Sequence, residues 1–363
     1  MADLNPDQKY FVEEFYEDYR EGLLSRREFV RRVAFITGSM ATTVVTMGAM
    51  GCSPDELPSP TDPMPTPQPP VASTTSQPAT LQPASPTIAA GEADTAAPSA
   101  IAIEPATSPV ATATSELALT PVPGAQSPLS VPIGHPSVNA VDITLASQGD
   151  EITAYLAQPA ESGTYPGVLV CHENRGLTAH IRDVARRFAQ AGYVAIAPDL
   201  LSREGGTDNL DRDQIPGLLS NAGAERHIAD FSAAFAYLQD LDTVAGERIG
   251  MTGYCFGGGI TWDVATTIPD LKAAVPFYGR GPALAQVANI EAAVLGVYAE
   301  QDTRINAGID ALQIALENAS VTHQFNIYPG VDHAFHNDTG SRYVEEQAMQ
   351  AWEDTLDWFV TYL

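Results

Sequence analysis

One long internal stretch of the chain lacks the residues that build a folded core. No Phe, Tyr or Trp occurs between Phe35 and Tyr155, and no Lys or Arg occurs between Arg32 and Arg175. A segment without aromatic side chains and with few large aliphatic ones buries too little apolar surface to offset its chain entropy. We therefore expect the 363-residue chain to fold mainly in its C-terminal part, from about Ser137 onward.

This stretch divides the chain into three parts. Residues 53–135 are dominated by Pro, Ser, Thr and Ala, a composition that predicts a disordered, extended spacer. Residues 1–52 precede the spacer, and residues 136–363 follow it and carry most of the aromatic side chains. The composition thus predicts an N-terminal segment, a spacer and one folded domain.

The N-terminal segment has the pattern of an export signal. The pair Arg26-Arg27 is followed by Phe29 and then by an apolar stretch from about Val33 to Met50. This order resembles a twin-arginine signal, which is read by a translocase that moves folded proteins. An ordinary amphipathic helix with an Arg-rich face is the open alternative. We expect the protein to be exported by a twin-arginine-type route and to lie outside the cytoplasm.

The end of the apolar stretch suggests a membrane tether. Ala49-Met50-Gly51-Cys52 resembles a bacterial lipobox, in which Cys52 would receive a lipid after cleavage. Two alternatives stay open. Cys52 is an incidental residue at a signal end, or the stretch is an uncleaved anchor, since about 18 mildly apolar residues only just reach spanning length. A membrane is an expected partner of the chain if Cys52 carries a lipid or if the stretch is an uncleaved anchor.

Charge and cysteine spacing exclude several classes of function. The net charge of −27 argues against nucleic acid as a partner, because phosphate binding needs clustered Lys and Arg. The acidic surface is instead well solvated. Cys52, Cys171 and Cys255 match neither a zinc pattern nor a CxxC motif. We expect neither a metal nor another cofactor.

The folded domain alternates between strand-like and helix-like segments. Strands are predicted over residues 152–157, 167–171, 193–197, 248–252, 273–278, 293–298 and 324–328, and helices over residues 179–191, 222–238, 257–267, 308–318 and 343–362. This alternation predicts an α/β fold, with a mostly parallel, doubly wound sheet covered by helices on both faces. In such sheets the chemistry sits at the carboxyl ends of the strands.

Cys255 lies where such a sheet presents a nucleophile. The run Gly253-Tyr254-Cys255-Phe256-Gly257 falls between a predicted strand and a predicted helix and has the G-x-nucleophile-x-G pattern, with Cys in place of Ser. Glycine on both sides removes the Cβ clashes that would forbid so sharp a turn. The following helix points its N-terminus at the sulfur, which favours a thiolate. Cys255 is therefore the predicted nucleophile.

Asp302 and His333 complete a predicted triad. Each follows a predicted strand, and the chain order is nucleophile, acid, histidine. His333 would take the thiol proton, and Asp302 would hold the imidazole in the required tautomer. Three near neighbours compete with these two assignments: Glu300, Asp332 and His336.

These motifs resemble those of the dienelactone hydrolase family. The resemblance covers nearly all of residues 140–363 and rests on the run from Gly167 to Arg203, the Cys255 elbow, and the Asp302 and His333 loops. It implies an α/β-hydrolase fold and a carboxylic ester hydrolase of the carboxymethylenebutenolidase kind. Such an enzyme opens small esters or lactones through a cysteine nucleophile and an acyl-enzyme.

The same resemblance assigns further roles. Glu173, after the early strand, would contact the thiol and help to deprotonate it. The backbone N–H groups of Asn174 and Phe256 would form the oxyanion hole, and Arg203 would bind a substrate carboxylate. A second substrate arginine after the histidine is absent: Asn337 stands near that place, and Arg342 is the nearest arginine. This departure makes dienelactone itself a doubtful substrate.

Two other functions remain to be weighed. A membrane-tethered binding protein could retain the hydrolase fold without turnover, although the complete set of catalytic residue types argues against it. A thiol redox protein is disfavoured by the missing CxxC motif. Finally, Cys171 ends a strand expected beside the one that leads to Cys255, so a regulatory disulfide between the two is a further hypothesis.

Overall fold

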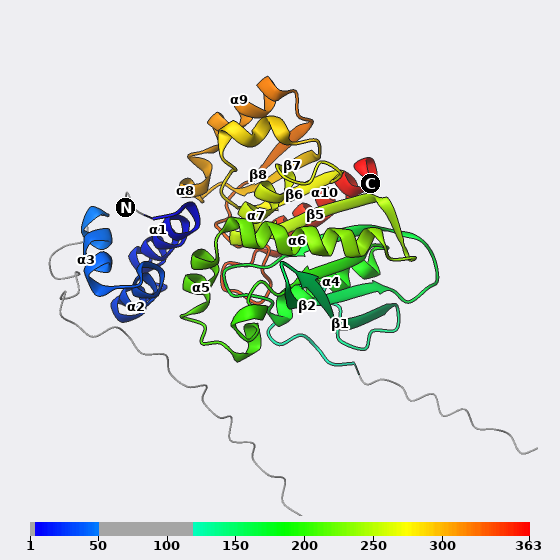
Figure 1. Ribbon diagram of the computed structural model, residues 1–363, viewed down its shortest axis with the longest axis horizontal. Coiled ribbons are helices and arrows are strands. Elements are labelled where there is room, and N and C mark those ends of the chain that lie inside the picture. The colour runs from blue at the N-terminus through cyan, green and yellow to red at the C-terminus, as the bar shows by residue number, and fades with distance from the viewer. Residues whose placement is uncertain (1–3, 51–118) are drawn as a thin grey trace, which may run out of the picture. The chain divides into compact units, whose positions relative to one another are not determined.

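An eight-stranded sheet forms the centre of the computed structural model, which describes residues 4–50 and 119–363 (Figure 1). The strands lie side by side in the order β1-β2-β4-β3-β5-β6-β7-β8. Their bounds are β1 Val138–Ser147, β2 Asp150–Pro159, β3 Tyr165–Cys171, β4 Val194–Pro198, β5 Val244–Tyr254, β6 Ala273–Phe277, β7 Ala293–Ala299 and β8 His323–Tyr328. All seven predicted strands are present, and β1 is an addition.

The sheet is mostly parallel, as predicted. Strands β1, β2 and β4 pair antiparallel, and every other neighbouring pair from β4 to β8 is parallel. Every residue of β4, β6 and β7 is buried. This agrees with their continuous apolar sequences, because a parallel strand is covered on both faces. The β1 strand lies at the edge and is mostly exposed, which explains why its sequence carries little apolar signal.

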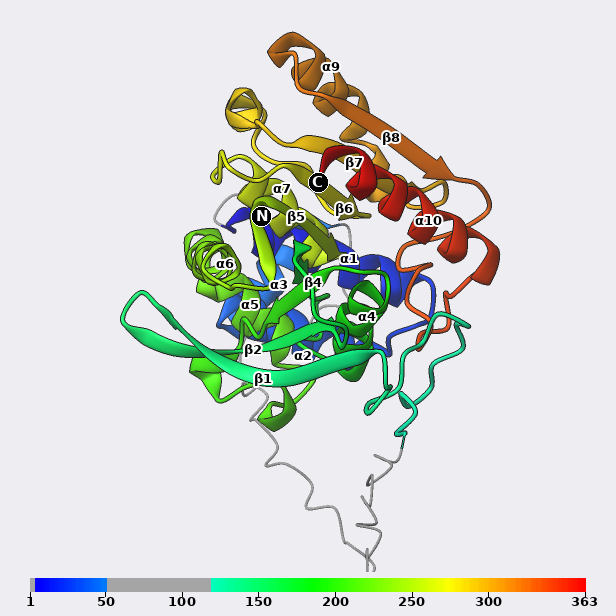
Figure 2. The same cartoon turned by 90° about the vertical axis from the view of Figure 1, so that its right-hand side faces the viewer.

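Helices cover both faces of this sheet. In the folded domain, residues 119–363, they are α4 Ala179–Gln190, α5 Ile215–Ala222, α6 Ala224–Gln239, α7 Phe256–Ala265, α8 Thr303–Asn306, α9 Ile309–Ala319 and α10 Glu345–Tyr362. Figure 2 shows α6 and α4 on opposite sides of the central strands. Phe188 of α4 packs against Trp352 of α10, with ring centroids 4.6 Å apart, so these helices share one face. Helix α6 packs on α7 across the other face.

The folded domain begins earlier than the composition predicts. Residues 119–135 were assigned to the spacer, yet they pack on the domain. Val131 is buried, and its N–H donates to the Asp183 carboxylate over 2.7 Å. The N–H of Ser127 donates to Asp338 over 3.0 Å. Buried carboxylates hold this segment, and an apolar periodicity would not reveal such an attachment. Cys52 and residues 53–118 lie outside the described residues.

The N-terminal segment consists of three helices. They are α1 Pro6–Arg20, α2 Arg26–Thr37 and α3 Met40–Ala49. Asn5 caps α1 in a reciprocal capping box with Gln8, and Ser25 caps α2 in the same way with Glu28. Such boxes satisfy two N–H groups at a helix start, so the local sequence sets where both helices begin. None of the helices in residues 4–50 and 119–363 is long and apolar enough to cross a membrane.

These helices pack on the catalytic domain, which the export reading did not anticipate. Helices α1 and α2 contact α5, and Gly217 of α5 lies so near the Phe35 backbone that a Cβ there would be 3.0 Å from it. Arg31 of α2 pairs with Asp211 over 2.7 Å. The observed α2 has the Arg-rich face of our alternative reading. Export stays a prediction, because the conformation of a segment does not show whether a translocase reads it.

Candidate active site

Cys255 sits on a strained turn between β5 and α7. Its backbone has φ 60° and ψ −119°, a left-handed region that L-residues rarely occupy. A Cβ on Gly253 would lie 2.2 Å from the carbonyl oxygen of Gly257, and one on Gly257 would lie 2.5 Å from that of His172. Both flanking glycines are therefore required by close backbone approach, as the G-x-C-x-G pattern predicts.

The predicted acid and histidine meet at the same edge of the sheet. Asp302 follows β7 and His333 follows β8, and the Asp302 Oδ2 atom lies 2.6 Å from His333 Nδ1. One ring nitrogen of His333 lies within 4.8 Å of the Cys255 sulfur. Because Asp302 holds Nδ1, the nitrogen left to face the thiol is Nε2. The three residues thus have the arrangement of a nucleophile, a base and an orienting acid.

The three competing neighbours have other partners. Glu300 accepts a hydrogen bond from the N–H of Gly330 over 2.8 Å. Asp332 accepts one from the backbone N–H of His333, and its carboxylate lies 3.6 Å from Arg342. The ring of His336 stacks on Tyr254 in the interior. Asp302 and His333 are therefore the carboxylate and imidazole that the structure brings together beside Cys255.

Electrostatic coupling between the two groups is strong. Burial by itself lowers the pKa of His333, but the Asp302 carboxylate and the nearby Cys255 raise it well above its ordinary range. Burial conversely favours protonated Asp302, yet the His333 charge and hydrogen bond lower the pKa of this carboxyl. The Asp302 carboxylate thus stabilises the imidazolium that forms when His333 accepts a proton.

The thiol itself is held in its neutral form. Burial raises the pKa of Cys255, the Glu14 carboxylate raises it further, and His333 opposes them. Helix α7 begins at Phe256, directly after Cys255, as predicted. Burial and the Glu14 charge thus favour the neutral thiol over the thiolate. Glu14, on the N-terminal helix α1, was not among the predicted site residues.

Two backbone donors remain available next to the sulfur. The N–H groups of Phe256 and Asn174 form no hydrogen bond with any described part of the chain. Phe256 N–H is the first of α7, and Asn174 N–H belongs to the loop after β3. Unused donors at a nucleophile are what an oxyanion hole requires. The assignment of these two N–H groups to an oxyanion hole stays a prediction.

Glu173 and Asn337 pair with each other. The Glu173 Oε2 atom accepts a hydrogen bond of 2.6 Å from the Asn337 amide. Glu173 acts on the thiol through its charge, which raises the pKa of Cys255. The resemblance assigns direct contact with the sulfur to Glu173. Among the described residues, Glu14 makes that contact. Asn337, which occupies the place of the absent arginine, serves to hold Glu173.

Arg203 is engaged in ion pairs that tie the sheet edge to α6. Its guanidinium donates to Asp230 over 2.8 Å, to Asp150 over 2.7 Å and to the carbonyl oxygen of Ser147 over 3.1 Å. Asp230 is fully buried. These contacts give Arg203 a structural role, and substrate binding by it stays a prediction. Arg342 pairs with Asp18 of α1 over 2.8 Å.

Two residues of α1 complete the surroundings of the sulfur. The Tyr10 hydroxyl lies 3.3 Å from the Cys255 sulfur, and the Glu14 carboxylate oxygens lie 3.8 and 3.9 Å from it. Asn174 donates its side-chain amide to Glu14. Sequence reasoning missed both residues. The available signal was the apolar spacing of Phe11 and Phe15, which indicates an amphipathic helix with a buried face.

With α1 in place the site is closed to solvent. The exposed fraction is 3% for Cys255, 4% for Asp302 and 7% for His333. One ligand-type atom from each of Glu14, Cys255 and His333 lies within 4.8 Å of the other two, and this buried trio has donor types found in zinc sites. Two of its members are the predicted nucleophile and base, so a metal held there would remove both from catalysis. The absence of a cofactor stays an expectation.

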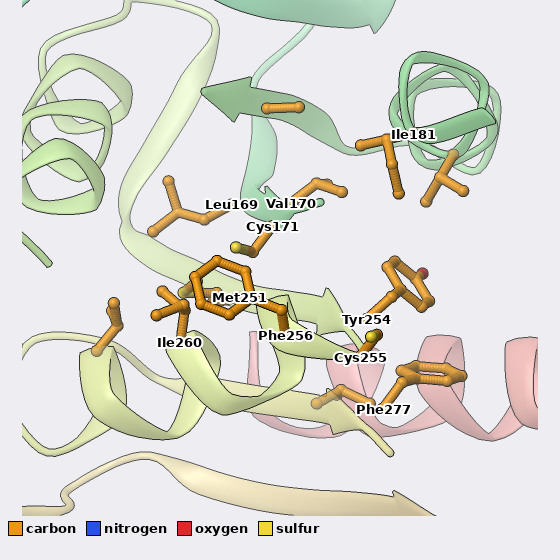
Figure 3. Close-up of a cluster of buried hydrophobic side chains, with 14 of the residues drawn as sticks. Leu169, Val170, Cys171, Ile181, Met251, Tyr254, Cys255, Phe256, Ile260 and Phe277 are labelled. Carbon is orange, nitrogen blue, oxygen red and sulfur yellow. The ribbon is translucent and has the colours of Figure 1, made fainter. Parts of the chain in front are cut away.

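The second buried cysteine is not bridged to the first. Cys171 and Cys255 are both free thiols, and Figure 3 shows their sulfur atoms apart from each other. Cys171 is fully buried at the end of β3, opposite Gly253 of β5 in the strand register. It packs in the apolar cluster of Figure 3 as a small side chain. The hypothetical disulfide is not formed.

Comparison with solved structures supports the same architecture. A dienelactone hydrolase-like protein from Klebsiella pneumoniae subsp. pneumoniae MGH 78578 superimposes with a TM-score of 0.58 at 34% identity, covering 62% of this chain and 99% of that one. The dienelactone hydrolase from Anabaena variabilis ATCC 29413 gives a TM-score of 0.51 at 20% identity, covering 62% and 99%, which shows the fold alone.

Sequence comparison agrees. A carboxymethylenebutenolidase-like protein of Methylorubrum extorquens is 37% identical over 236 residues, which span 61% of this chain and 81% of the relative. One from Escherichia coli K12 is 37% identical over 240 residues, 60% and 86% of the two chains. The model of the dienelactone hydrolase family matches residues 152–363, more than half of the chain. With the α/β-hydrolase sheet and the site at its carboxyl edge, these matches establish that the chain belongs to the dienelactone hydrolase family and is a hydrolase of that kind.

Proposed function

We propose that this protein hydrolyses small esters or lactones with Cys255 as a covalent nucleophile. The observation that carries the proposal is the meeting, on one sheet edge, of a cysteine on a strained elbow with an imidazole held by a buried carboxylate over 2.6 Å. The two unused N–H groups beside the sulfur add a place for a developing oxyanion. The similarity to carboxymethylenebutenolidase-like and dienelactone hydrolase-like proteins supplies the substrate class.

The proposed reaction has two steps, formation of a thioester on Cys255 and its hydrolysis. His333 takes the thiol proton, and the Cys255 sulfur forms a bond to the carbonyl carbon while the carbonyl electron pair moves to oxygen between the Phe256 and Asn174 N–H groups. The C–O bond to the alcohol then breaks, and the alcohol leaves with the proton from His333. For a lactone, this alcohol stays attached to the acyl group. Water, deprotonated by His333, cleaves the thioester to the acid and the free thiol.

The experiment looks for the covalent intermediate. Purified protein is mixed with p-nitrophenyl acetate at slightly acidic pH, quenched, and analysed by mass spectrometry of its peptides. We expect an acetyl group on the Cys255 peptide and release of p-nitrophenol over many turnovers. An intact protein mass without any adduct, together with no turnover of any aryl ester or lactone, would instead favour the tethered binding protein. Acylation of Cys171 with Cys255 unmodified would contradict the assignment of the nucleophile.

We also propose that residues 1–52 direct export and that Cys52 carries the lipid of a membrane tether. The Arg26-Arg27 pair, the small residue before Cys52 and the long Pro- and Ser-rich segment behind it support this. The several acyl chains of a bacterial lipoprotein hold stably to a bilayer, whereas one chain holds only marginally. Mass spectrometry of membrane-extracted protein tests it. An unmodified Cys52, or an N-terminus still at Met1, would contradict the proposal.

A further inference from the structure

Helix α1 lies outside the family match, yet it reaches the Cys255 sulfur of the candidate site. The match begins at residue 152, whereas α1 ends at Arg20. Both Tyr10 and Glu14 are buried, at 4% and 6% exposure, and both point at the Cys255 sulfur. They lie on one face of the helix, because residues four apart are neighbours on a helix surface. A segment that lies more than 200 residues from the nucleophile in sequence thus supplies two groups to it.

The docking of α1 is built from charge pairs along the helix. Asp7 accepts from Arg280 over 2.8 Å, and Glu17 accepts from Arg304 over 2.8 Å. Near the end of the helix, Asp18 accepts from Arg342 over 2.8 Å. Each carboxylate belongs to α1, and each arginine belongs to the catalytic domain.

Aromatic contacts add to these pairs. The Arg304 guanidinium lies over the Tyr10 ring at 4.7 Å, and Phe11 stacks on Phe256 with ring centroids 5.2 Å apart. Phe256 is the residue whose N–H faces the proposed oxyanion. Helix α1 is therefore seated against the elbow itself by packing, in addition to its salt bridges.

A bound helix and a bound substrate exclude each other. An acyl carbon must come within about 3–3.5 Å of the sulfur before attack. The Tyr10 hydroxyl already lies 3.3 Å from the sulfur. The Glu14 carboxylate lies beside it and accepts a hydrogen bond from the Asn174 side-chain amide. The Glu14 carboxylate also accepts a hydrogen bond from the Cys255 thiol over 3.8 Å, which favours the neutral thiol. Both effects oppose acylation.

We propose that Tyr10 and Glu14 are resting-state residues of this active site: they cover the Cys255 sulfur and keep it protonated, so that turnover requires α1 to leave. The proposal rests on the proposed function, because it takes Cys255 as the nucleophile. It also connects the export proposal with the active site, since a cleavage that makes Cys52 the N-terminus would remove α1 along with the signal. Full-length protein would then turn over ester slowly, only while α1 is transiently detached, and processed protein would turn it over faster.

The test compares two adjacent carboxylates of α1 in the full-length chain. Glu14 faces the sulfur, whereas Glu13 pairs with Lys9 over 3.8 Å at the surface. The variants are Glu14→Ala with Tyr10→Ala, and the matched control Glu13→Ala. The readout is the second-order rate of iodoacetamide alkylation, located by peptide mass spectrometry, with buried Cys171 as the internal reference. Alkylation reports access to the thiol whether or not any ester is turned over.

We expect alkylation of Cys255 to rise by about tenfold or more in the double variant, because reactivity follows exposure and thiolate content. Glu13→Ala should change it by less than about twofold, and Cys171 should stay unreactive in all variants. Ester turnover should rise in parallel. Equal Cys255 alkylation in the wild type and the double variant would overturn the proposal. If Cys255 is alkylated faster in the double variant but neither that variant nor the wild type hydrolyses any ester, only the proposed function fails.

A second variant separates charge from coverage. The titratable groups that interact with the Cys255 sulfur are Tyr10 and Glu14 from α1, Cys171 at the end of β3, Glu173 from the loop after β3, Tyr278 after β6, and His333. Glu14→Gln keeps the volume and removes the charge, so the pH midpoint of Cys255 alkylation should fall. A protein that only needed Glu14 for packing would keep the wild-type midpoint. If Glu14→Gln abolishes ester turnover as fully as the loss of Cys255 does, Glu14 is the catalytic base and the proposal is wrong.

Discussion

The two sides of the site differ in how the chain builds them. The sheet side contributes Cys255, Asp302 and His333 from turns that directly follow parallel strands, so their positions are fixed by backbone pairing across the sheet. The helix side contributes Tyr10 and Glu14 from an amphipathic helix held by ion pairs and aromatic packing. Strand register is rigid, whereas ion pairs at a surface are weak and salt-dependent. We therefore expect chemistry from the first side and control from the second.

The largest effect should come from removing the sulfur on the sheet side. Cys255→Ala should lower ester turnover at least about 10³-fold, since the covalent route is lost. Its matched control is Cys171→Ala, which removes the other buried thiol and should leave turnover within about threefold. Steady-state kinetics of both variants on one aryl ester measures the contrast. Wild-type turnover by the Cys255 variant would break the assignment of the entire sheet side.

The next effect concerns the base and its orienting acid. His333→Ala should lower turnover by about 10²–10⁴-fold, the range for loss of a general base. Asp302→Asn should also impair turnover, and it should lower the pKa of His333, because the carboxylate is what raises that pKa. The acidic limb of the pH–rate profile would then move to lower pH. An unmoved limb would mean that a different group holds the imidazole.

The same contrast explains what could be predicted from the sequence. The triad was predictable because each member follows an apolar strand, and strand order brings such turns together whatever the loops between them do. The elbow carried its own confirmation in Gly253 and Gly257, whose missing Cβ atoms the backbone contacts require. The mostly parallel sheet followed from the same alternation of apolar runs and helical periods.

The helix side was not predictable by that route. The acidic sequence before Arg26 has the apolar spacing of an amphipathic helix, but this spacing does not show which surface the helix covers. The partners of α1 are Arg280, Arg304 and Arg342, which are separated widely in the chain and belong to no motif. The packing of residues 119–135 on the domain was not predicted for a similar reason, since buried carboxylates hold this segment. Polar contacts between residues far apart in the chain produce no periodic pattern in the sequence.

A stability prediction addresses those buried carboxylates. Asp338 binds His180 over 2.9 Å and Arg187 over 2.8 Å. Burial alone would raise the pKa of Asp338, but these two partners lower it strongly. Asp338→Asn should lower the free energy of unfolding by about 3 kcal/mol at pH 7, because it leaves Arg187 partly unpaired in the interior. Urea unfolding measures this, and exposed Glu353→Gln is the control, expected within about 0.5 kcal/mol.

The pH dependence of this difference follows from linkage. A carboxyl whose folded pKa is depressed stabilises the fold fully above its unfolded pKa of about 3.9. That contribution is lost as the pH falls toward the folded pKa. The gap between wild type and Asp338→Asn should therefore be constant from pH 7 to about pH 5 and narrow below about pH 4. A gap that widens on acidification would show that another group dominates the cluster.

The smallest effect tests Arg203, where resemblance and structure point in different directions. Resemblance assigns it to a substrate carboxylate, whereas the structure ties it to buried Asp230 and to Asp150 at the sheet edge. Arg203→Lys keeps the charge but loses the guanidinium fork that spans both partners. We expect a loss of about 1 kcal/mol in the free energy of unfolding and a KM within about twofold of wild type for esters with and without a carboxylate. Because a lost bidentate contact to a bound carboxylate costs about tenfold or more, a KM raised only for the carboxylate-bearing ester would return Arg203 to the site. That outcome would also move the substrate pocket toward the β1–β2 edge and away from the face that α1 covers.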